Sequence, residues 1–343
     1  MAITIRDVAS EAGVSTATVS RVLAAFHAEA HRTGISRQVA ETTRLRVMAA
    51  AKRLDYRMNH AARTLKTRFT MTVGVLFPEL ANDFFMDVAE GLERELSGRG
   101  YTMLMASTFN SIGEERQRVF TLADRVDGMV VIPAGSRGEH LQALADEGMP
   151  MVLVDRLLEG VELEAISSDN EDGMFRLTKA LLDDGFSRIA FVGGEITLSA
   201  ARERLSGYGR ALAEAGIQSD PSWICLGGME VEDGYRRMES LLERENPPEA
   251  MVAVNMLIHL GMERCLLDRK ERGAIPPPVI AGFDESRYSP FLPACRYTAC
   301  QDAVGIGRKA GERIVSQIRE KIEGTREKPG ERIVRLPVTI HRS

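Results

Sequence analysis

The first side chains with a recognisable binding chemistry lie on a short helical pattern close to the start of the chain. Residues 16–23 place an apolar stripe on one side, which leaves a small, mostly polar set on the other: Thr16, Ala17, Ser20 and Arg21. An arginine can read a guanine edge or contact a phosphate, and the short side chains suit thymine methyl groups or DNA shape. This set predicts contact with double-stranded nucleic acid.

A second helical pattern precedes this segment and fixes its position. Ile5, Val8, Ala9 and Ala12 recur at helical spacing, and Thr4 with Asp7 is typical of an N-terminal cap pair. Gly13-Val14 breaks the helix, and Ser15 can cap the next one. Two short helices joined by a glycine turn predict a helix-turn-helix unit, whose second helix enters the major groove. Helix spacing alone also allows a pair of helices from another bundle.

The distribution of charge supports the nucleic-acid interpretation. The net charge of the 343-residue chain is −5, but residues 1–70 hold 12 Lys and Arg against 5 Asp and Glu, a balance of +7. The remainder therefore carries −12. A basic head on an acidic body is typical of a small DNA-binding module attached to a larger domain that avoids phosphates.

The complete sequence pattern of this region resembles a known N-terminal DNA-binding domain, the headpiece. The pattern T-I-x-D-V-A-x-x-A-G-V-S-x-x-T-V-S-R-V-L is similar to the LacI family of bacterial transcription regulators, and T-R-x-R-V-x-A-A-A-x-x-L-x-Y falls on a helix that we expect at residues 40–54. Two departures are an Ala at position 24, where the family usually has Asn, and a longer connection to the third helix. His27 and His31 in that connection have a metal-compatible spacing, but we expect them in a loop or extended helix.

The resemblance implies which residues touch DNA. In the headpiece they are Ser15, Thr16, Ala17, Thr18, Ser20 and Arg21. Residues 58–70 resemble the family's hinge helix. The resemblance implies that Asn59 and Arg63 contact the DNA and that Leu65 inserts into the minor groove as an apolar wedge. The alternative is a plain linker whose leucine packs on the next domain. Met58 replaces a common proline of this hinge.

From residue 71 the pattern alternates buried strands with amphipathic helices. We expect strands at residues 72–77, 101–108, 128–133, 149–156, 188–194, 223–228, 250–255 and 278–284. Helices are expected near residues 84–99, 114–125, 139–147, 200–215, 232–244 and 258–272. This alternation predicts an α/β core of two doubly wound parallel-sheet lobes.

The core resembles the periplasmic-binding-protein-like core of the LacI family, and the resemblance covers essentially the whole chain. It implies a headpiece at residues 1–57, a hinge at 58–70 and an effector-binding, dimerising core at 71–343. The chain would cross between lobes three times. Lobe one would comprise about 71–168 and 301–330, and lobe two about 169–300 and 331–343.

Ligands of open α/β sheets bind beyond the carboxyl ends of the strands. The resemblance implies the same places for an effector, through Phe84, Phe85, Arg202, Arg204, Met229, Asn255 and Asp284. Arg204 matches the arginine that grips effector oxygens, with Arg202 as the secondary candidate. Met229 stands where the family has an aromatic platform, and Met256 replaces an acid. These methionines predict a pocket that is more apolar and less sugar-like than is usual.

Other classes of function find little support in the sequence. No G-x-S-x-G, nucleotide-binding glycine motif or P-loop occurs, so we expect no enzyme and no cofactor. Cys225, Cys265, Cys295 and Cys300 have no local metal spacing and are expected to be reduced core thiols. Without a signal peptide or an apolar run of membrane length, we expect a cytoplasmic protein with no membrane partner.

The sequence thus predicts a homodimeric, operator-binding transcriptional repressor controlled by a small-molecule effector such as a sugar or sugar acid. No leucine heptad follows the last strand-like segment, so a dimer is expected rather than a tetramer. One alternative is a regulator of the same type with a vestigial cleft and a protein co-effector. The other, from a different class, is a solute-binding receptor.

Overall fold

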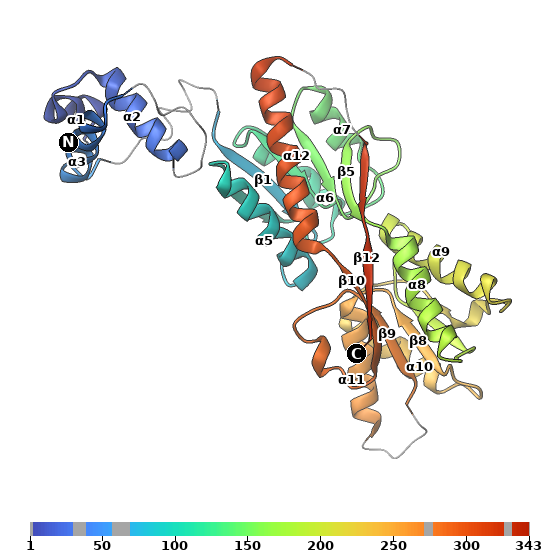
Figure 1. Cartoon of the computed structure of the whole chain (residues 1–343). Coiled ribbons are helices and arrows are strands. Elements are labelled where there is room, and N and C mark those ends of the chain that lie inside the picture. The colour runs from blue at the N-terminus through green and yellow to red at the C-terminus, as the bar shows by residue number, and fades with distance from the viewer. Residues whose placement is uncertain (1–2, 30–38, 57–68, 271–276, 326–330, 343) are drawn as a thin grey trace.

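A computed structural model describes residues 3–29, 39–56, 69–270, 277–325 and 331–342. The described residues of the N-terminal unit form three helices (Figure 1): α1 (Ile5–Ala12), α2 (Thr16–Glu29) and α3 (Glu41–Arg53). Their apolar stripes meet in a small core formed by Val8, Ala9, Ala12, Val19, Val22, Leu23, Val47, Ala50 and Ala51. This core confirms the stripes expected from helical spacing.

The turn between α1 and α2 is built as the sequence predicts. The Asp7 carboxylate accepts hydrogen bonds from the Thr4 backbone amide, at 2.8 Å, and from the Thr4 hydroxyl, at 2.7 Å. Gly13 ends α1 with φ of 62°, a left-handed conformation that glycine adopts without strain. The Ser15 hydroxyl then accepts a hydrogen bond from the backbone amide of Thr18 at 3.1 Å and so caps α2.

Helix α2 is longer than expected. It continues past Leu23 to Glu29, so Phe26 and His27 lie on the helix rather than in a loop. The residues of this extension, from Ala24 to Glu29, include no glycine or proline that would end a helix. His31 lies outside the described residues.

The first lobe is a six-stranded parallel sheet in the order β11-β5-β4-β3-β1-β2. Its strands are β1 (Thr72–Phe77), β2 (Thr102–Ser107), β3 (Gly128–Val131), β4 (Met151–Val154), β5 (Glu164–Ser168) and β11 (Ile333–Leu336). Its helices are α5 (Asp83–Gly98), α6 (Ile112–Ala123), α7 (Glu139–Asp146) and α12 (Ala303–Glu323). The sheet has a buried apolar cluster on each face, as expected when helices cover both sides.

The second lobe is a six-stranded sheet in the order β12-β10-β9-β8-β6-β7. Its strands are β6 (Ile189–Val192), β7 (Ile224–Cys225), β8 (Ala250–Ala253), β9 (Val279–Phe283), β10 (Cys295–Gln301) and β12 (Val338–Arg342). Its helices are α8 (Asn170–Asp183), α9 (Ser199–Glu214), α10 (Val231–Leu242) and α11 (Met256–Lys270), with short 3-10 turns at Pro221–Trp223 and Ser289–Phe291. All neighbours are parallel except β12, which runs antiparallel to β10.

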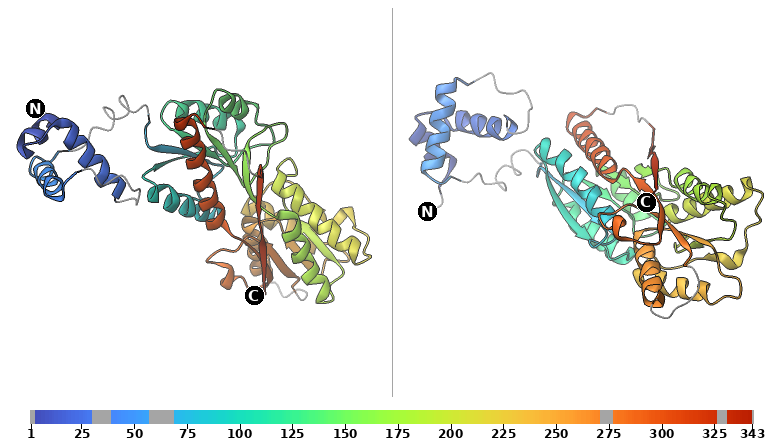
Figure 2. Two further views of the ribbon diagram at one scale, coloured as in Figure 1. Left: turned by 45° about the horizontal axis from the view of Figure 1, so that its top comes forward. Right: turned by 60° about the horizontal axis from the view of Figure 1, so that its bottom comes forward.

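The chain passes between the two sheets three times. It does so between β5 and α8, between β10 and α12, and at Pro337, between β11 and β12. The last crossing therefore lies later than residue 330, where we expected it, because β11 still pairs with β5. The two final strands, red in Figures 1 and 2, run one after the other past both lobes.

Helix α12, which belongs to the second chain segment of the first lobe, packs closely against α5 of the first segment. Helices α5 and α12 approach so closely that a Cβ atom on Gly91 would lie 2.1 Å from the carbonyl oxygen of Val304. A Cβ on Gly307 would lie 2.0 Å from the carbonyl oxygen of Val88. These two glycines therefore admit no larger residue.

None of the helices in the described part of the chain is both long and apolar enough to cross a membrane.

Candidate functional site

The second helix of the headpiece presents the predicted face. Thr16, Ala17 and Arg21 are exposed, while Ser20 is half-buried. The Arg21 Nε donates a long hydrogen bond, 3.4 Å, to the backbone carbonyl of Ala17 one turn earlier. The guanidinium therefore lies along the exposed surface of α2 and keeps further donors for an external acceptor.

Two of the predicted DNA contacts have a structural role in this turn. The Ser15 and Thr18 hydroxyl groups lie 2.9 Å apart, and Ser15 also caps the helix. Both side chains thus fix the start of α2, which orients the exposed residues that follow. The hinge residues Asn59, Arg63 and Leu65, together with Met58, lie outside the described residues.

A cavity of about 210 Å³ lies between the two lobes. Its walls come from strand ends and helix starts of both sheets, where the strand-end rule places a ligand. Eleven of its 19 lining residues carry charged or amide side chains: Glu79, Asn82, Asn110, Asp155, Arg156, Glu195, Arg204, Glu230, Asn255, Asp284 and Gln301. Polar side chains thus make up much of the lining, and the expectation that this pocket is more apolar than is usual in the family stays a prediction.

Arg204, on α9, is the best-anchored side chain of the cavity. It is 4% exposed, its Nε donates to Asn170 Oδ1 at 2.8 Å, and its Nη1 donates to the Val254 carbonyl at 2.7 Å. The guanidinium carbon also lies 3.7 Å from the centre of the Phe283 ring. These contacts fix the plane of the guanidinium, which pre-organises its remaining donors.

Asp284 follows directly after strand β9, and Asn255 lies two residues beyond the end of β8, directly before α11. The Asp284 Oδ1 lies 3.9 Å from Arg204 Nη2 and accepts a hydrogen bond from the Gln301 amide. Asp284 has φ of 75°, a left-handed conformation that directs the carboxylate at the strand end. Asn255 Oδ1 accepts from the Ile258 amide at 2.9 Å, so this side chain lines the cavity and also caps α11.

The structure adds Asp155 and Arg156, which we did not identify from the sequence. Asp155 follows β4, has φ of 64° and is 6% exposed. Burial raises its pKa, although the guanidinium groups of Arg204 and Arg156 oppose this shift. Its Oδ1 is buried and has no hydrogen-bond partner among the described residues. The strand-end rule could have found Asp155, because it comes directly after a buried strand.

Arg156 is the second buried cation of the cavity. Its Nη1 donates to the Pro133 carbonyl at 2.8 Å and to Asn110 Oδ1 at 3.2 Å, and its Nε lies 3.9 Å from Asp155 Oδ2. Burial lowers the pKa of Arg156 from its ordinary value. Two guanidinium groups therefore approach the cavity from opposite lobes.

The other predicted effector contacts divide into two groups. Phe84 and Phe85, both buried, and Met229 line the cavity. Arg202 does not: its side chain is 47% exposed and pairs with Glu159 at 3.0 Å on the surface. Met256 is buried and is not a lining residue, so the loss of an acid at this position leaves the cavity polar.

Acidic side chains predominate among the charged residues of the cavity lining. Glu79 contributes from the first lobe, and Glu195 and Glu230 from the second. The pKa of Glu230 is raised, chiefly by partial burial and then by the nearby carboxylates of Glu79 and Asp233. Together with Asp155 and Asp284, these groups outnumber the two arginines.

Two family models match the chain. The model of bacterial regulatory proteins of the LacI family matches residues 4–59, and the model of periplasmic binding proteins and the sugar binding domain of the LacI family matches residues 70–332. The HTH-type transcriptional repressor PurR of Aliivibrio salmonicida is 31% identical over 322 residues, which cover 93% of each chain.

Solved structures agree with this relationship. A ribose operon repressor described as putative, from Burkholderia thailandensis, is 27% identical, with a TM-score of 0.70 over 80% of this chain and 99% of that one. A complex of the transcriptional regulator CelR with cellobiose is 28% identical, with a TM-score of 0.69 over 99% and 98%. The Lac repressor dimer bound to operator, at 24% identity, has a TM-score of 0.80 over 99% and 98% and shows the same fold.

The chain therefore belongs to the LacI family of bacterial regulatory proteins. It is a DNA-binding transcriptional repressor of the kind that a small-molecule effector controls. Its relatives are repressors rather than enzymes.

Proposed function

We propose that the effector is a compact, neutral, polyhydroxylated molecule of the sugar class, bound in the cavity between the lobes. The observation that carries this proposal is the convergence of buried donors and acceptors: the guanidinium groups of Arg204 and Arg156 beside the carboxylates of Asp155 and Asp284. A hydroxyl group donates and accepts at once, so it can satisfy both kinds of partner. The unpartnered Asp155 Oδ1 supports a ligand donor at that point.

The size and charge of the cavity narrow the class. A volume of about 210 Å³ is below the ~300–1,000 Å³ typical of sites for drug-sized ligands, so a monosaccharide-sized ligand suits it better. Carboxylates outnumber guanidinium groups in the lining, so the cavity repels an anionic ligand. We therefore expect a neutral sugar to bind more tightly than a sugar acid. Phe84, Phe85 and Met229 supply the apolar surface against which a sugar face packs.

Thermal unfolding against a ligand panel tests this proposal. The panel holds neutral sugars, sugar acids, aromatic acids and nucleobases, and a ligand at 100 times its Kd adds about 2.7 kcal/mol of stability. We expect a neutral sugar to raise Tm in the wild type and not in Arg204→Ala. Arg210→Ala is the matched control, because this arginine lies on the same helix outside the cavity and pairs with Glu171 of the same lobe, and it should respond as the wild type does.

Other outcomes of the panel have definite meanings. A sugar acid as the best ligand would overturn the preference for a neutral effector. A response that survives in Arg204→Ala would remove this residue from the site. If no compound in the panel raised Tm, a protein co-effector and a vestigial cleft would become the better hypothesis, although the polar lining argues against it.

The proposed DNA contact uses the exposed face of α2. Arg21 has the chemistry to read guanine or bind phosphate, and Thr16 and Ala17 suit methyl groups. Two copies would place two headpieces on a pseudo-palindromic operator in the cytoplasm, where the chromosome lies. Asn59, Arg63 and Leu65 would contact its centre, with Leu65 as the wedge.

The proposed dimer buries apolar surface of the first lobe. Leu104 and Met105 are exposed on β2, the edge strand of that sheet, and Phe109 and Ile112 are exposed just beyond it. A group of exposed apolar side chains is typical of a protein interface.

We also propose the division into headpiece (1–57), hinge (58–70) and core (71–343), with the last lobe boundary moved to Pro337.

A further inference from the structure

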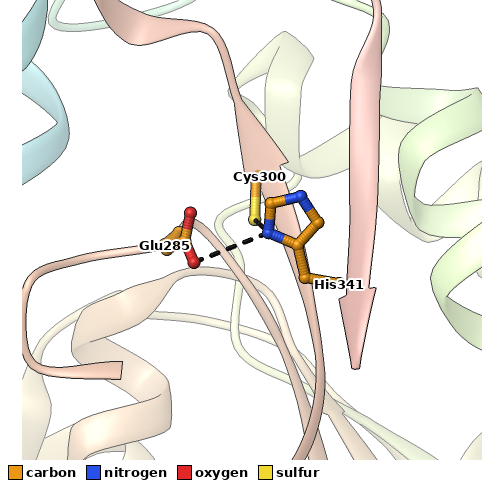
Figure 3. A group of neighbouring side chains, drawn as sticks. All are labelled: Glu285, Cys300 and His341. Carbon is orange, nitrogen blue, oxygen red and sulfur yellow. Dashed lines mark hydrogen bonds and ion pairs between the residues drawn. The ribbon is translucent and has the colours of Figure 1, made fainter. Parts of the chain in front are cut away.

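Three side chains with metal-binding chemistry meet on the second lobe, and none of them lines the effector cavity (Figure 3). Cys300 comes from β10, His341 from β12, and Glu285 from the loop after β9. The Cys300 Sγ lies 3.1 Å from His341 Nδ1, which lies 3.6 Å from Glu285 Oε1. One donor atom of each residue lies within 4.8 Å of the other two.

Strand pairing builds this group. In the antiparallel pair, Thr298 lies opposite His341 and Cys300 lies opposite Thr339. His341 and Cys300 are therefore diagonal neighbours on one face of the sheet, a distance that long side chains span. Their separation of 41 positions in the sequence explains why no local cysteine–histidine spacing indicated a site.

The geometry distinguishes a cation site from a proton relay. In a cysteine–histidine–acid relay the thiol and the carboxylate use different ring nitrogens of the histidine. Here both Cys300 Sγ and Glu285 Oε1 approach the same nitrogen, His341 Nδ1. Three donor atoms that converge on one point, rather than forming a chain, are what a metal ion requires.

We propose that Cys300, His341 and Glu285 bind a thiophilic divalent cation, with Zn²⁺ as the best fit. Thiolate, imidazole and carboxylate are the ligand set that zinc prefers in proteins. Bond lengths of ~2.0–2.3 Å in a tetrahedron place ligand atoms roughly 3.3–3.6 Å apart, close to the observed separations of 3.1 and 3.6 Å. Water would occupy the fourth position.

The exposure of the three side chains supports this assignment. The Cys300 side chain is buried, whereas those of His341 and Glu285 are 55% and 50% exposed, so an ion can enter from solvent. Zinc binds the thiolate form of cysteine, so ion binding must release the Cys300 proton to solvent.

The site would also tighten one wall of the effector cavity. Glu285 follows Asp284 in the chain, and Cys300 precedes Gln301, whose amide donates to the Asp284 carboxylate. An ion that joins Glu285 to Cys300 would hold these two cavity residues together. This consequence rests on the proposed function, whereas the cation site does not.

Titration of the untagged, full-length protein with Co²⁺ tests the site. A tetrahedral Co²⁺–thiolate centre has visible ligand-field bands and a near-ultraviolet sulfur-to-metal band. We expect both at one ion per chain, and their loss when Zn²⁺ is added. Cys300→Ser should abolish the sulfur band, and His341→Gln should weaken binding at least tenfold. Cys225→Ser is the matched control, because Cys225 lies on β7 at the far edge of the sheet.

The same experiment can overturn the proposal. A wild-type protein without a thiolate band, or a band that persists in Cys300→Ser, would show that these residues hold no ion. His341→Gln removes a ligand at a half-exposed position, so it tests the site even if Cys300→Ser does not fold. Effector titration with and without Zn²⁺ then tests the coupling separately. An unchanged effector Kd would remove the coupling and leave the cation site standing.

Discussion

The Ser199 hydroxyl accepts a hydrogen bond from the backbone amide of Leu157 at 2.7 Å, and this bond joins the two lobes. Ser199 is the first residue of α9 and is 4% exposed, and Leu157 follows β4 in the first sheet. Arg204 lies on the same helix, so the bond ties the helix that carries this cavity arginine to the opposite wall. Separation of the lobes would break it.

Ser199→Ala should therefore weaken effector binding without altering the cavity itself. A hydrogen bond contributes about 0.5–1.5 kcal/mol net, so we expect the effector Kd to rise between about twofold and tenfold. Calorimetric titration with the ligand identified by the panel measures this change. Ser206→Ala, on the exposed side of the same helix, should leave Kd unchanged. Equal values for both variants would contradict a role for the bond in closure.

Arg21→Ala should relax operator preference. If Arg21 reads a base, its loss costs about 1–3 kcal/mol of specific binding and leaves most nonspecific binding intact. Competition of operator against mutated operators, at fixed salt, measures this preference. Arg46→Ala removes an exposed charge from α3 of the same headpiece and should keep it. If Arg21→Ala ranks the operators by affinity in the same order as the wild type, Arg21 contacts a phosphate rather than a base.

Asp155→Asn should change both the pH dependence of stability and the affinity for the effector. Because the folded-state pKa of Asp155 is raised, its contribution to stability is present at low pH and is lost as pH rises from about 3.8 through the folded pKa. The amide should therefore flatten the fall in unfolding free energy over this window. It should also weaken effector binding roughly ten- to hundredfold, as for a lost hydrogen bond to a charged group.

Urea unfolding across pH and effector titration measure the two effects of Asp155→Asn. Asp124→Asn is the control, an exposed acid at the end of α6 in the same lobe, and it should alter neither. A wild-type pH slope in Asp155→Asn would mean that another group causes it. An unchanged effector Kd would exclude Asp155 as a ligand contact.

The headpiece should loosen in acid at its first turn. Hydrogen bonds from the Thr4 backbone and hydroxyl hold the pKa of Asp7 below its ordinary 3.8. A lowered carboxyl pKa means that its stabilisation is present above that ordinary value and is lost as pH falls through the folded pKa. Asp7→Asn should increase hydrogen exchange of the α1 amides at neutral pH and remove this acid transition. Glu11→Gln, in the last turn, should keep the transition.

Local chemistry made the headpiece predictable, and the core was predictable only in part. Thr4, Asp7, Gly13 and Ser15 act on neighbours within a few residues, so their roles follow from spacing. Helices α8 and α12 were not placed, although each follows a crossing between lobes. Strands β5 and β10, which precede these helices, were not predicted either. Asp169 and Asp302 cap the two helices through their side chains, a local signal that the sequence contains and that we did not use.

The site required contacts that the sequence does not encode locally. Arg204 and Asp284 could be placed by strand ends and family wording, and both line the cavity. Arg202, two residues away on the helix, points to the surface because one helical turn holds 3.6 residues. The pairing of Cys300 with His341 depends on the register of β10 with β12, which no sequence pattern fixes.

The placement of β11 and β12 has a consequence for how the protein is made. These strands form the outer edge of the first and second sheets, and both come from residues 333–342. During synthesis the headpiece can fold early, but each sheet stays one strand short until this stretch leaves the ribosome. A frameshift or premature stop upstream of it would therefore expose a bare sheet edge in both halves of the core, a known route to aggregation.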